Sequence, residues 1–329
     1  MRIISPNAEL LPNTDEPYKM IEKAGRICYK SEEKSSEDSS KRFVKMLINN
    51  KHTAMLEHAW IHFSCSSYLT YNLLDIIPVE YLKYIVIDDG LISGSFRAFV
   101  ELLDNCKNYA YSDLKLLSEL LIKIYPEVFD KFKDDYSLTE ACRILKNTNA
   151  TYTLTGNEFD DITIYTSRQL QDYYPYKHNL YRHLPHTIKF TCDRGVTHEF
   201  VRHRPASFAQ ESTRYCNYSN GKFNNEITVI KPIFYDEHSE NYNTWKKSCE
   251  FCEKSYMELI NNGSTPQEAR SVLPNSLKTE LIITATEEEW QHIMNLRLKG
   301  TTGVPHPQMA EVMTIAGTIL NRVSDKRIG

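Results

Sequence analysis

The densest group of side chains that could perform chemistry lies at residues 202–215, which read RHRPASFAQESTRY. Three arginines and a histidine fall within 13 positions, and serine, threonine and glutamine stand beside them. Adjacent buried cations are costly unless an anion compensates them, and the arginine fork of donors matches a phosphate. Hydroxyl and backbone N–H groups can complete such a site. An isolated Arg-His-Arg would indicate a solvated basic turn, but the polar continuation favours a phosphate or nucleotide site.

A zinc hydrolase is the first alternative, because Glu199 directly follows His198. That chemistry needs His-Glu-x-x-His, which places both imidazoles on one face of a helix. Arg202 stands where the second histidine should be, and His203 comes one position too late. An arginine at a ligand position repels a cation, so the sequence predicts no metal site. The other histidines of this region also match no known ligand spacing: His178, His183 and His186.

A redox or zinc role for cysteine is the second alternative. Cys249 and Cys252 form one Cys-x-x-Cys pair, which cannot fill a tetrahedral site alone. The pair falls inside a predicted helix at 237–262, whereas a thioredoxin-like pair needs a strand followed by a helix start. We therefore expect spectator thiols there, and structural, hydrogen-bonded side chains at His62 and His292.

The run Arg202-His203-Arg204, followed after seven residues by Ser212, resembles the signature of the flavin-dependent thymidylate synthases, the ThyX family. The likeness continues through Arg214-Tyr215. Other segments agree in the expected order, and together they cover roughly 1–65 and 187–329. They are Arg-Ile-Cys-Tyr at 26–29, His-x-x-x-x-Glu-His at 52–58, Glu-Ala-Arg-Ser-Val-Leu-Pro at 268–274 and Asn-Leu-Arg at 295–297.

This resemblance implies reductive methylation of dUMP to dTMP. The family takes a methylene group from methylenetetrahydrofolate, and FAD, which NADPH reduces, supplies the hydride. No cysteine attacks the uracil, so the protein contributes orientation and electrostatics while the cofactor carries the redox step. The FAD pyrophosphate and the dUMP phosphate are both anions, which accounts for many arginines in an acidic chain.

The resemblance also assigns roles to individual positions. His52, Ser212 and Arg214 would take part in the reaction, with His52 close to the folate side, and Ser212 would position a ligand rather than act as a triad nucleophile. The side chains that would contact FAD are His52, Glu57, Arg202, His203, Arg204, Asn295 and Arg297. Those that would line the dUMP pocket are Glu199, Gln210, Ser212, Thr213 and Arg214.

Three positions depart from the family pattern. Glu199 stands where most members carry glutamine against dUMP, and a carboxylate only accepts hydrogen bonds. Glu280 stands where many members have an arginine, and the last helix has no arginine near Ala310. Lys278, Arg270 or a residue of the insertion described below could supply the missing cation. The alternative function is therefore a nucleotide-binding protein, or a methylase or hydroxymethylase of another pyrimidine nucleotide, on the same scaffold.

Local patterns predict the elements that must position these residues. Apolar residues at helical spacing indicate helices at 16–30 and 37–49, and 60–65 reads as a half-buried strand. A strand at 277–285 leads into a helix capped by Thr286 and Glu289. The last helix begins near Pro307, because proline suits the first helical position. Together these elements predict an α+β fold.

Residues 66–186 differ in composition from the rest of the chain, because they are rich in Tyr, Leu, Lys and Asp. They have no counterpart in the compact core of the family that the chain resembles. The predictions here are a long helical stretch at 96–132 broken near Tyr125-Pro126, a short helix at 138–145 and a β-rich piece at 151–166. We expect one ThyX-like catalytic core, 1–65 and 187–329, with a mostly helical insertion at 66–186 that serves as a lid or an oligomer interface.

Composition limits the remaining classes. The chain of 329 residues is 41% hydrophobic and 11% aromatic, which is typical of a globular protein. A net charge of -4 argues against a nucleic acid polymer as partner. No apolar run approaches the roughly 20 residues of a membrane span, and the N-terminus has no signal-like core. We expect a cytoplasmic protein with reduced cysteines, and family precedent implies a homotetramer with shared active sites.

Overall fold

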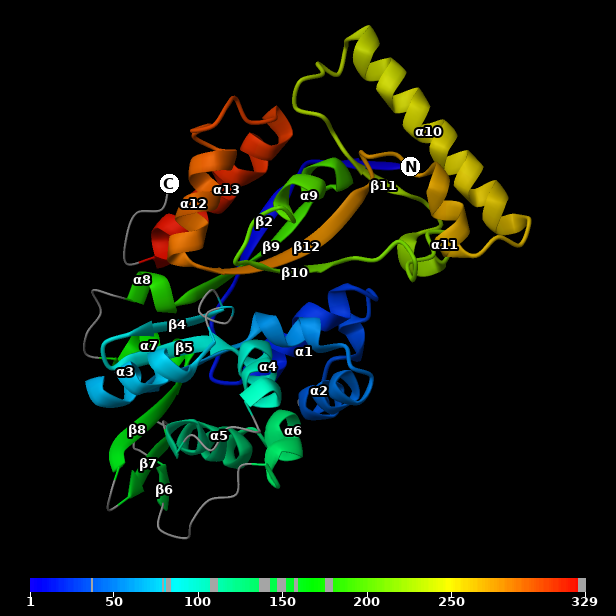
Figure 1. Cartoon of the computed structure of the whole chain (residues 1–329). Helices are drawn as coiled ribbons and strands as arrows, with labels where there is room; N and C mark the ends of the chain where they lie inside the picture. Colours follow the sequence, from blue (N-terminus) through cyan, green and yellow to red (C-terminus); the bar gives the residue numbers. More distant parts are fainter. Residues whose placement is uncertain are drawn as a thin grey trace. The chain divides into compact units, whose positions relative to one another are not determined.

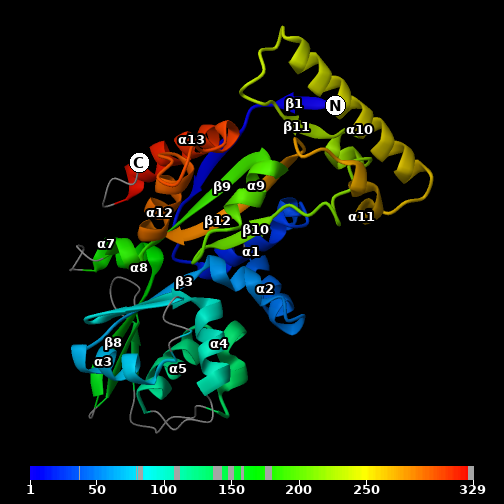
Figure 2. The same cartoon turned by 45° about the horizontal axis from the view of Figure 1, so that its top comes forward.

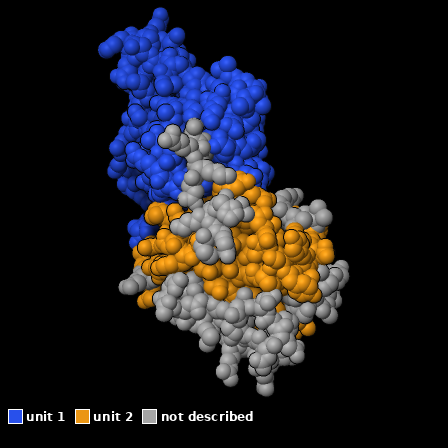
Figure 3. All heavy atoms as spheres, turned by 90° about the vertical axis from the view of Figure 1, so that its left-hand side faces the viewer, with its two compact units in different colours: residues 1–11, 24–33, 186–329 blue, residues 12–23, 34–185 orange. Residues whose placement is uncertain are grey.

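The computed structural model describes residues 1–36, 38–78, 80, 84–106, 112–135, 143–146, 152–156, 159–174 and 180–324. The chain divides into two compact units (Figure 1, Figure 3). Unit 1 comprises Met1–Leu11, Ala24–Glu33 and His186–Gly329, and unit 2 comprises Pro12–Lys23 and Lys34–Pro185. Helix α1 (Pro17–Ile27) contributes residues to both. No helix in the described ranges has the length and apolar character that crossing a membrane requires.

Unit 1 is built on a four-stranded sheet in the order β10-β12-β9-β2. Side chains alternate between the two faces of a strand, so each strand can serve two environments. One face carries apolar residues such as Phe190 and Ile283, which pack against three helices; the last of these, α13, contacts β2 (Figure 2). The other face carries Lys189, Lys278 and Glu280. The elements are β2 (Asn7–Leu11), β9 (Pro185–Asp193), β10 (Ser207–Gln210), β12 (Lys278–Thr286), α9 (Arg194–Phe200), α12 (Glu287–Arg297) and α13 (Pro307–Val323).

A second core of unit 1 forms around the long helix α10 (Glu240–Asn261). Tyr256 and Cys249 of this helix are buried with Leu277, next to the short helix α11 (Pro266–Ala269). Burial, with a contribution from Cys252, raises the pKa of Cys249 to about 11, which keeps this thiol protonated and unreactive at neutral pH. A parallel pair of strands, β1 (Arg2–Ile4) and β11 (Thr228–Ile230), borders this core.

Unit 2 contains a six-stranded sheet in the order β4-β5-β3-β8-β7-β6. Its apolar core includes Phe63, Phe96 and Phe99, and His62 is hydrogen-bonded at both ring nitrogens, as expected of a structural histidine. The strands are β3 (Trp60–Ser64), β4 (Ile85–Asp88), β5 (Leu91–Ser95), β6 (Arg143–Lys146), β7 (Tyr152–Gly156) and β8 (Phe159–Thr166). The helices are α2 (Ser39–Asn49), α3 (Ser67–Ile76), α4 (Phe96–Cys106), α5 (Ser112–Ile124), α6 (Pro126–Phe129), α7 (Ser167–Tyr173) and α8 (Leu180–His183), with the 3-10 turn η2 (Thr53–His58).

These elements confirm the predicted α+β class and most predicted boundaries. The break at Tyr125-Pro126 is present because α5 ends at Ile124 and α6 begins at the proline. The helix predicted at 138–145 is wrong over its last residues, because Arg143–Lys146 forms β6 and pairs with β7. Backbone pairing across the sheet overrode a weak local helical pattern there; its first residues, 138–142, lie outside the described ranges.

Candidate functional site

The residues predicted to bind the flavin begin where helix α9 ends. Asp193 caps the start of this helix by accepting a hydrogen bond from Val196 N at 2.8 Å. The chain then turns, so that the side chain of His203 is buried whereas Arg202 and Arg204 are exposed. The turn thus buries the neutral imidazole of His203, which can accept a hydrogen bond, and exposes the guanidinium groups of Arg202 and Arg204 to solvent. This is an arrangement that an anion can approach.

Arg297, the last residue of α12, connects this turn to α12. Its Nη1 donates to Glu199 Oε2 at 2.7 Å, and its Nη2 donates to the backbone oxygen of Glu199 at 3.3 Å. Its Nε donates to His203 Nε2 at 3.0 Å. The structure therefore brings together Glu199, His203 and Arg297, of which the last is separated from the first by 98 positions.

The electrostatics of this cluster keep His203 neutral. Burial, then the charges of Arg297 and His292, lower the pKa of His203 to about 4. On the same helix, burial and Glu288 raise the pKa of Glu289 to about 7. His203, Glu289 and His292 could offer ligand atoms within 4.8 Å of one another. However, the guanidinium of Arg297 contacts the same imidazole and repels a cation, so the trio is a poor metal site.

The remaining predicted flavin residues of unit 1 flank the cluster. Asn295 is half-buried, and its side-chain oxygen accepts a hydrogen bond from Gln291 at 3.0 Å. Arg204 donates from Nη1 to the backbone oxygens of Val201 and His203 at 3.0 and 2.7 Å, and its guanidinium lies 5.5 Å from the Phe208 ring centroid. These contacts fix the position of Arg204 without neutralising its charge.

The residues predicted to bind the nucleotide follow strand β10. Gln210 donates to the hydroxyls of Thr197 and Thr279 at 3.0 and 3.3 Å, so its amide is held inside unit 1. The backbone of Ser212 donates to Cys28 O at 3.1 Å, which ties the segment to the end of α1. The side chain of Ser212 accepts from the Arg214 backbone at 3.3 Å. Thr213 is buried, and Arg214 is exposed with its guanidinium 5.6 Å from the Tyr215 ring centroid.

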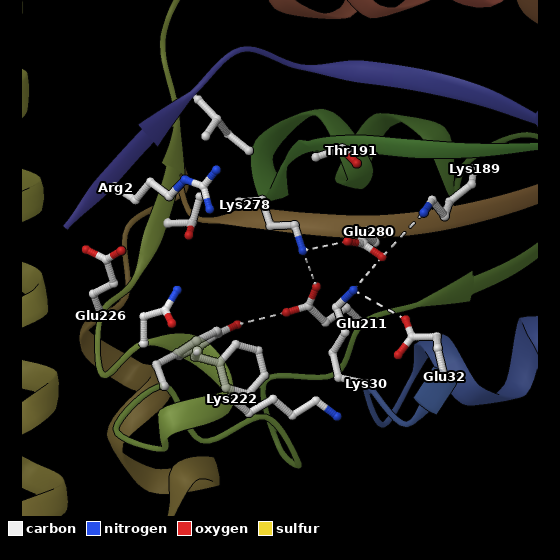
Figure 4. A pocket seen from close by; sticks show the side chains of 15 residues that line it. Arg2, Lys30, Glu32, Lys189, Thr191, Glu211, Lys222, Glu226, Lys278 and Glu280 are labelled. Atoms are coloured by element: carbon white, nitrogen blue, oxygen red, sulfur yellow. Dashed lines mark hydrogen bonds and ion pairs between the residues drawn. The ribbon is translucent and has the colours of Figure 1, made fainter. Parts of the chain in front are cut away.

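A cavity of about 650 Å³ lies beside this segment on the polar face of the unit 1 sheet (Figure 4). Lys278 Nζ donates to Glu211 Oε2 and to Glu280 Oε1, both at 2.9 Å. Lys30 also pairs with Glu280, and Tyr218 donates to Glu211 at 3.4 Å. Burial alone would raise the pKa of Glu280, but Lys278 and Lys30 lower it to about 2. The floor of the cavity is therefore a charge-balanced network.

Sequence reasoning missed part of this network. Lys278, a candidate replacement cation, has its side chain in the lining of the cavity. Lys30, Glu211 and Tyr218 were not predicted. Alternation along β12, which puts Lys278 and Glu280 on one face, was a signal for that pair. No comparable signal existed for Lys30, which is far away in the sequence.

The other two predicted residues belong to unit 2. His52 is exposed and precedes η2. Glu57 is half-buried, and Arg97 Nη1 donates to its carboxylate at 2.6 Å. The same arginine also holds Glu101 at 2.7 Å. Sequence reasoning did not identify Arg97, although Arg97 and Glu101 have the spacing of a helical ion pair.

Curated proteins similar to this chain are flavin-dependent thymidylate synthases. That of Pyrococcus furiosus is 38% identical over 107 residues, which are 32% of this chain and 43% of that protein. That of Geobacter sulfurreducens is 30% identical over 104 residues, 32% of this chain and 43% of that protein. That of Mycobacterium avium is 26% identical over 147 residues, 40% of this chain and 54% of that protein. The chain thus spans less than half the length of the first two relatives.

The chain is also similar to a solved structure and matches a protein family. A UMP/dUMP methylase PolB from Streptomyces cacaoi, bound with 5-Br dUMP, aligns over 98% of this chain and 93% of that one. Its sequence is 13% identical to this chain, and the TM-score of the alignment is 0.39. Residues 9–71 and 133–324, more than half of the chain, match the family described as thymidylate synthase complementing protein. The resemblance seen around residues 202–214 is thereby confirmed, and the chain belongs to this family.

Proposed function

We propose that this protein catalyses the reductive methylation of dUMP to dTMP, with methylenetetrahydrofolate as carbon donor and NADPH as reductant of a bound FAD. Membership of the family and the names of the curated relatives support the reaction class. The resemblance of the 202–214 segment to the flavin-dependent thymidylate synthases supports the cofactor, the folate and NADPH.

One observation carries the proposal. Arg202, Arg204 and Arg214 have no carboxylate partner among the residues that the structure describes, although they lie within 13 positions of a chain with net charge -4. Nearby cations such as Lys278 and Arg297 are paired with glutamates. A guanidinium without a carboxylate partner can bind a phosphate in a bidentate manner. The donor set therefore fits a dinucleotide pyrophosphate and a nucleotide phosphate.

The residues of each unit have separate proposed roles. When bound, FAD would supply the hydride that the reaction requires. The residues proposed to hold it are Arg202, His203, Arg204, Asn295 and Arg297 of unit 1, with His52 and Glu57 of unit 2. The residues proposed to hold dUMP are Glu199, Gln210, Ser212, Thr213 and Arg214. Among these, His52, Ser212 and Arg214 are proposed to contact the reacting groups.

The cavity next to the 210–214 segment supports a nucleotide site near it; Glu211 is the residue of that segment that lines the cavity. Its volume of about 650 Å³ is ample for a small-molecule ligand. Lys278 is the proposed replacement for the arginine that this chain lacks, because its ammonium lines the cavity. Arg270 is the weaker candidate for that role, because it does not line the cavity and its Nη1 makes only a long contact of 3.5 Å with the Thr213 hydroxyl.

We also propose that residues 66–186 are an insertion in the catalytic core, and that the protein is a homotetramer whose active sites are shared between chains. The family match leaves 72–132 unmatched, which supports an insertion over that part. Light scattering coupled to size exclusion tests the tetramer, and a monomer at micromolar concentration would refute it.

Flavin binding is the first experimental test. Purified protein titrated with FAD should show bound-flavin absorbance, and this spectrum should change when dUMP is added. Arg202→Ala should weaken FAD binding by roughly ten- to a hundredfold, since a charge-assisted contact contributes on the order of 1.5–3 kcal/mol. Arg322→Ala, which removes an exposed arginine at the end of α13, is the matched control. Equal FAD affinities of the two variants would contradict the assignment.

A second candidate is a nucleotide-binding protein or a methylase of another pyrimidine nucleotide. The observation that favours it is Glu280, whose carboxylate takes up the charge of Lys278 and Lys30 in the cavity. Tritium release from 5-tritiated dUMP with folate, FAD and NADPH would support the first function. Tight dUMP binding without release would support the second. Ser212→Ala should reduce nucleotide affinity or turnover in either case, and normal values of both would remove Ser212 from the site.

A further inference from the structure

We propose that Glu199 is a positioning residue: acting through Arg297, it fixes the imidazole of His203 in the tautomer that carries its proton on Nδ1. The inference deepens the proposed function, on which its consequence for flavin binding rests. It adds a role for one carboxylate oxygen of Glu199 that is separate from any contact with the nucleotide.

The tautomer follows from hydrogen-bond chemistry. A guanidinium has only donors, so the 3.0 Å contact between Arg297 Nε and His203 Nε2 requires a lone pair on Nε2. A neutral imidazole must then carry its proton on Nδ1. His203 is 4% exposed, and the pKa of its imidazole is lowered to about 4, so the ring is neutral at physiological pH.

The hydrogen bond to the Glu199 carboxylate holds the Arg297 guanidinium beside His203. Two of the three contacts of the guanidinium go to Glu199, one to Oε2 and one to the backbone oxygen, and only the third goes to His203. Charge-assisted bonds to a carboxylate are about twice as strong as neutral ones. Without Glu199, a cation whose side chain is 22% exposed would have no carboxylate and would turn toward water.

In this tautomer His203 presents its Nδ1–H group as a hydrogen-bond donor in the proposed flavin site. The charged and titratable groups that face His203 from α12 are Arg297, His292 and Glu289. One buried oxygen of Glu289, Oε1, has no partner among the described residues. With Nε2 occupied by Arg297, only Nδ1–H of His203 is free for an acceptor on a ligand.

The test reads the tautomer directly in flavin-free protein. Histidine labelled with 15N gives distinct ring-nitrogen shifts for the two neutral tautomers, and a His203→Gln spectrum assigns the signal. Wild type should show Nδ1–H, and Glu199→Ala should move the population toward Nε2–H. Glu199→Gln keeps an acceptor oxygen and should retain Nδ1–H. Glu237→Ala, which breaks the exposed pair with Lys231, is the matched control and should change nothing.

Two results would overturn the inference: an Nε2–H ring in wild type, or an Nδ1–H ring that is unchanged in Glu199→Ala. Arg297→Lys is a second variant, because a lysine cannot reproduce the planar fork, and it should shift the tautomer in the same direction. FAD affinity separates this inference from the proposed function. It should fall about tenfold in Glu199→Ala and recover in Glu199→Gln. If wild type binds no FAD while its ring is Nδ1–H, the function fails and the positioning role stands.

Discussion

Replacing Ser93 with alanine should destabilise unit 2 by several kcal/mol, because this hydroxyl is the centre of a buried chain of hydrogen bonds. Ser93 Oγ lies 2.7 Å from His62 Nδ1 and 2.8 Å from His183 Nδ1. The chain ends at Ser167 Oγ, 3.0 Å from His62 Nε2, and at Asp88 Oδ2, 2.9 Å from His183 Nε2. Ser93 and both histidines are fully buried.

The carboxylate at one end sets the direction of every bond. Asp88 can only accept, so His183 donates from Nε2 and accepts at Nδ1. The Ser93 hydroxyl therefore donates to His183 and accepts from His62 Nδ1–H. His62 Nε2 then accepts from the Ser167 hydroxyl. Removing the Ser93 oxygen leaves one donor, on His62, and one acceptor, on His183, without partners in a dry interior.

The magnitude follows from those two groups. A buried polar group left without a partner costs about 1–3 kcal/mol, so Ser93→Ala should cost about 2–6 kcal/mol. Ser118→Ala is the matched control: it makes the same change at a fully buried serine of unit 2. The Ser118 hydroxyl donates to the carbonyl of Leu114 within α5, so its loss leaves no unpaired donor and should cost less than about 1 kcal/mol.

Hydrogen exchange measured by mass spectrometry suits this test, because peptides from 85–106 report on unit 2 alone. A loss of 2 kcal/mol accelerates exchange through global opening roughly 30-fold. Amides of β5 should show this acceleration in Ser93→Ala and not in Ser118→Ala. If the two variants differ by less than about 0.5 kcal/mol, the hydroxyl is not the centre of the network and the reasoning is wrong.

Three further predictions concern charge. Burial lowers the pKa of His62 and His183, so below pH ~6.5 the unfolded chain binds more protons than the folded chain. The melting temperature of unit 2 should therefore decrease as the pH falls below that value. A melting temperature that does not change with pH in this range would contradict the prediction. The pH dependence that Glu289 causes has the opposite sign: its pKa is raised to about 7, so its contribution to stability is lost as the pH rises toward and through 7. Glu289→Gln should remove this decline in the melting temperature of flavin-free protein. Lys278→Met removes the cation from Glu211, whose side chain is 1% exposed, and should cost about 3 kcal/mol in urea denaturation, whereas a loss below 1 kcal/mol would match an exposed pair.

The boundaries of many elements could be predicted because they depend on neighbours in the sequence. Pro307 begins α13, and the Thr286 hydroxyl caps α12 through the Glu289 N–H, as the local patterns indicated. Strand β6 could not be predicted, since the partner that defines it is another strand. For the same reason the contact between Glu199 and Arg297, which lie 98 positions apart, could not be predicted from the sequence.

The departures from the family pattern have a common physical feature that only the structure reveals. Glu199 and Glu280 are both acidic where the family pattern has a glutamine or an arginine, and a lone carboxylate at either place would repel a phosphate. Each is instead held by a cation of unit 1: Glu199 by Arg297, and Glu280 by Lys278 with Lys30. Their fields are therefore largely cancelled locally. The arginines at 202, 204 and 214 have no carboxylate partner among the described residues, so at the proposed site we expect the acidic substitutions to change shape and hydrogen bonding more than the attraction for a phosphate.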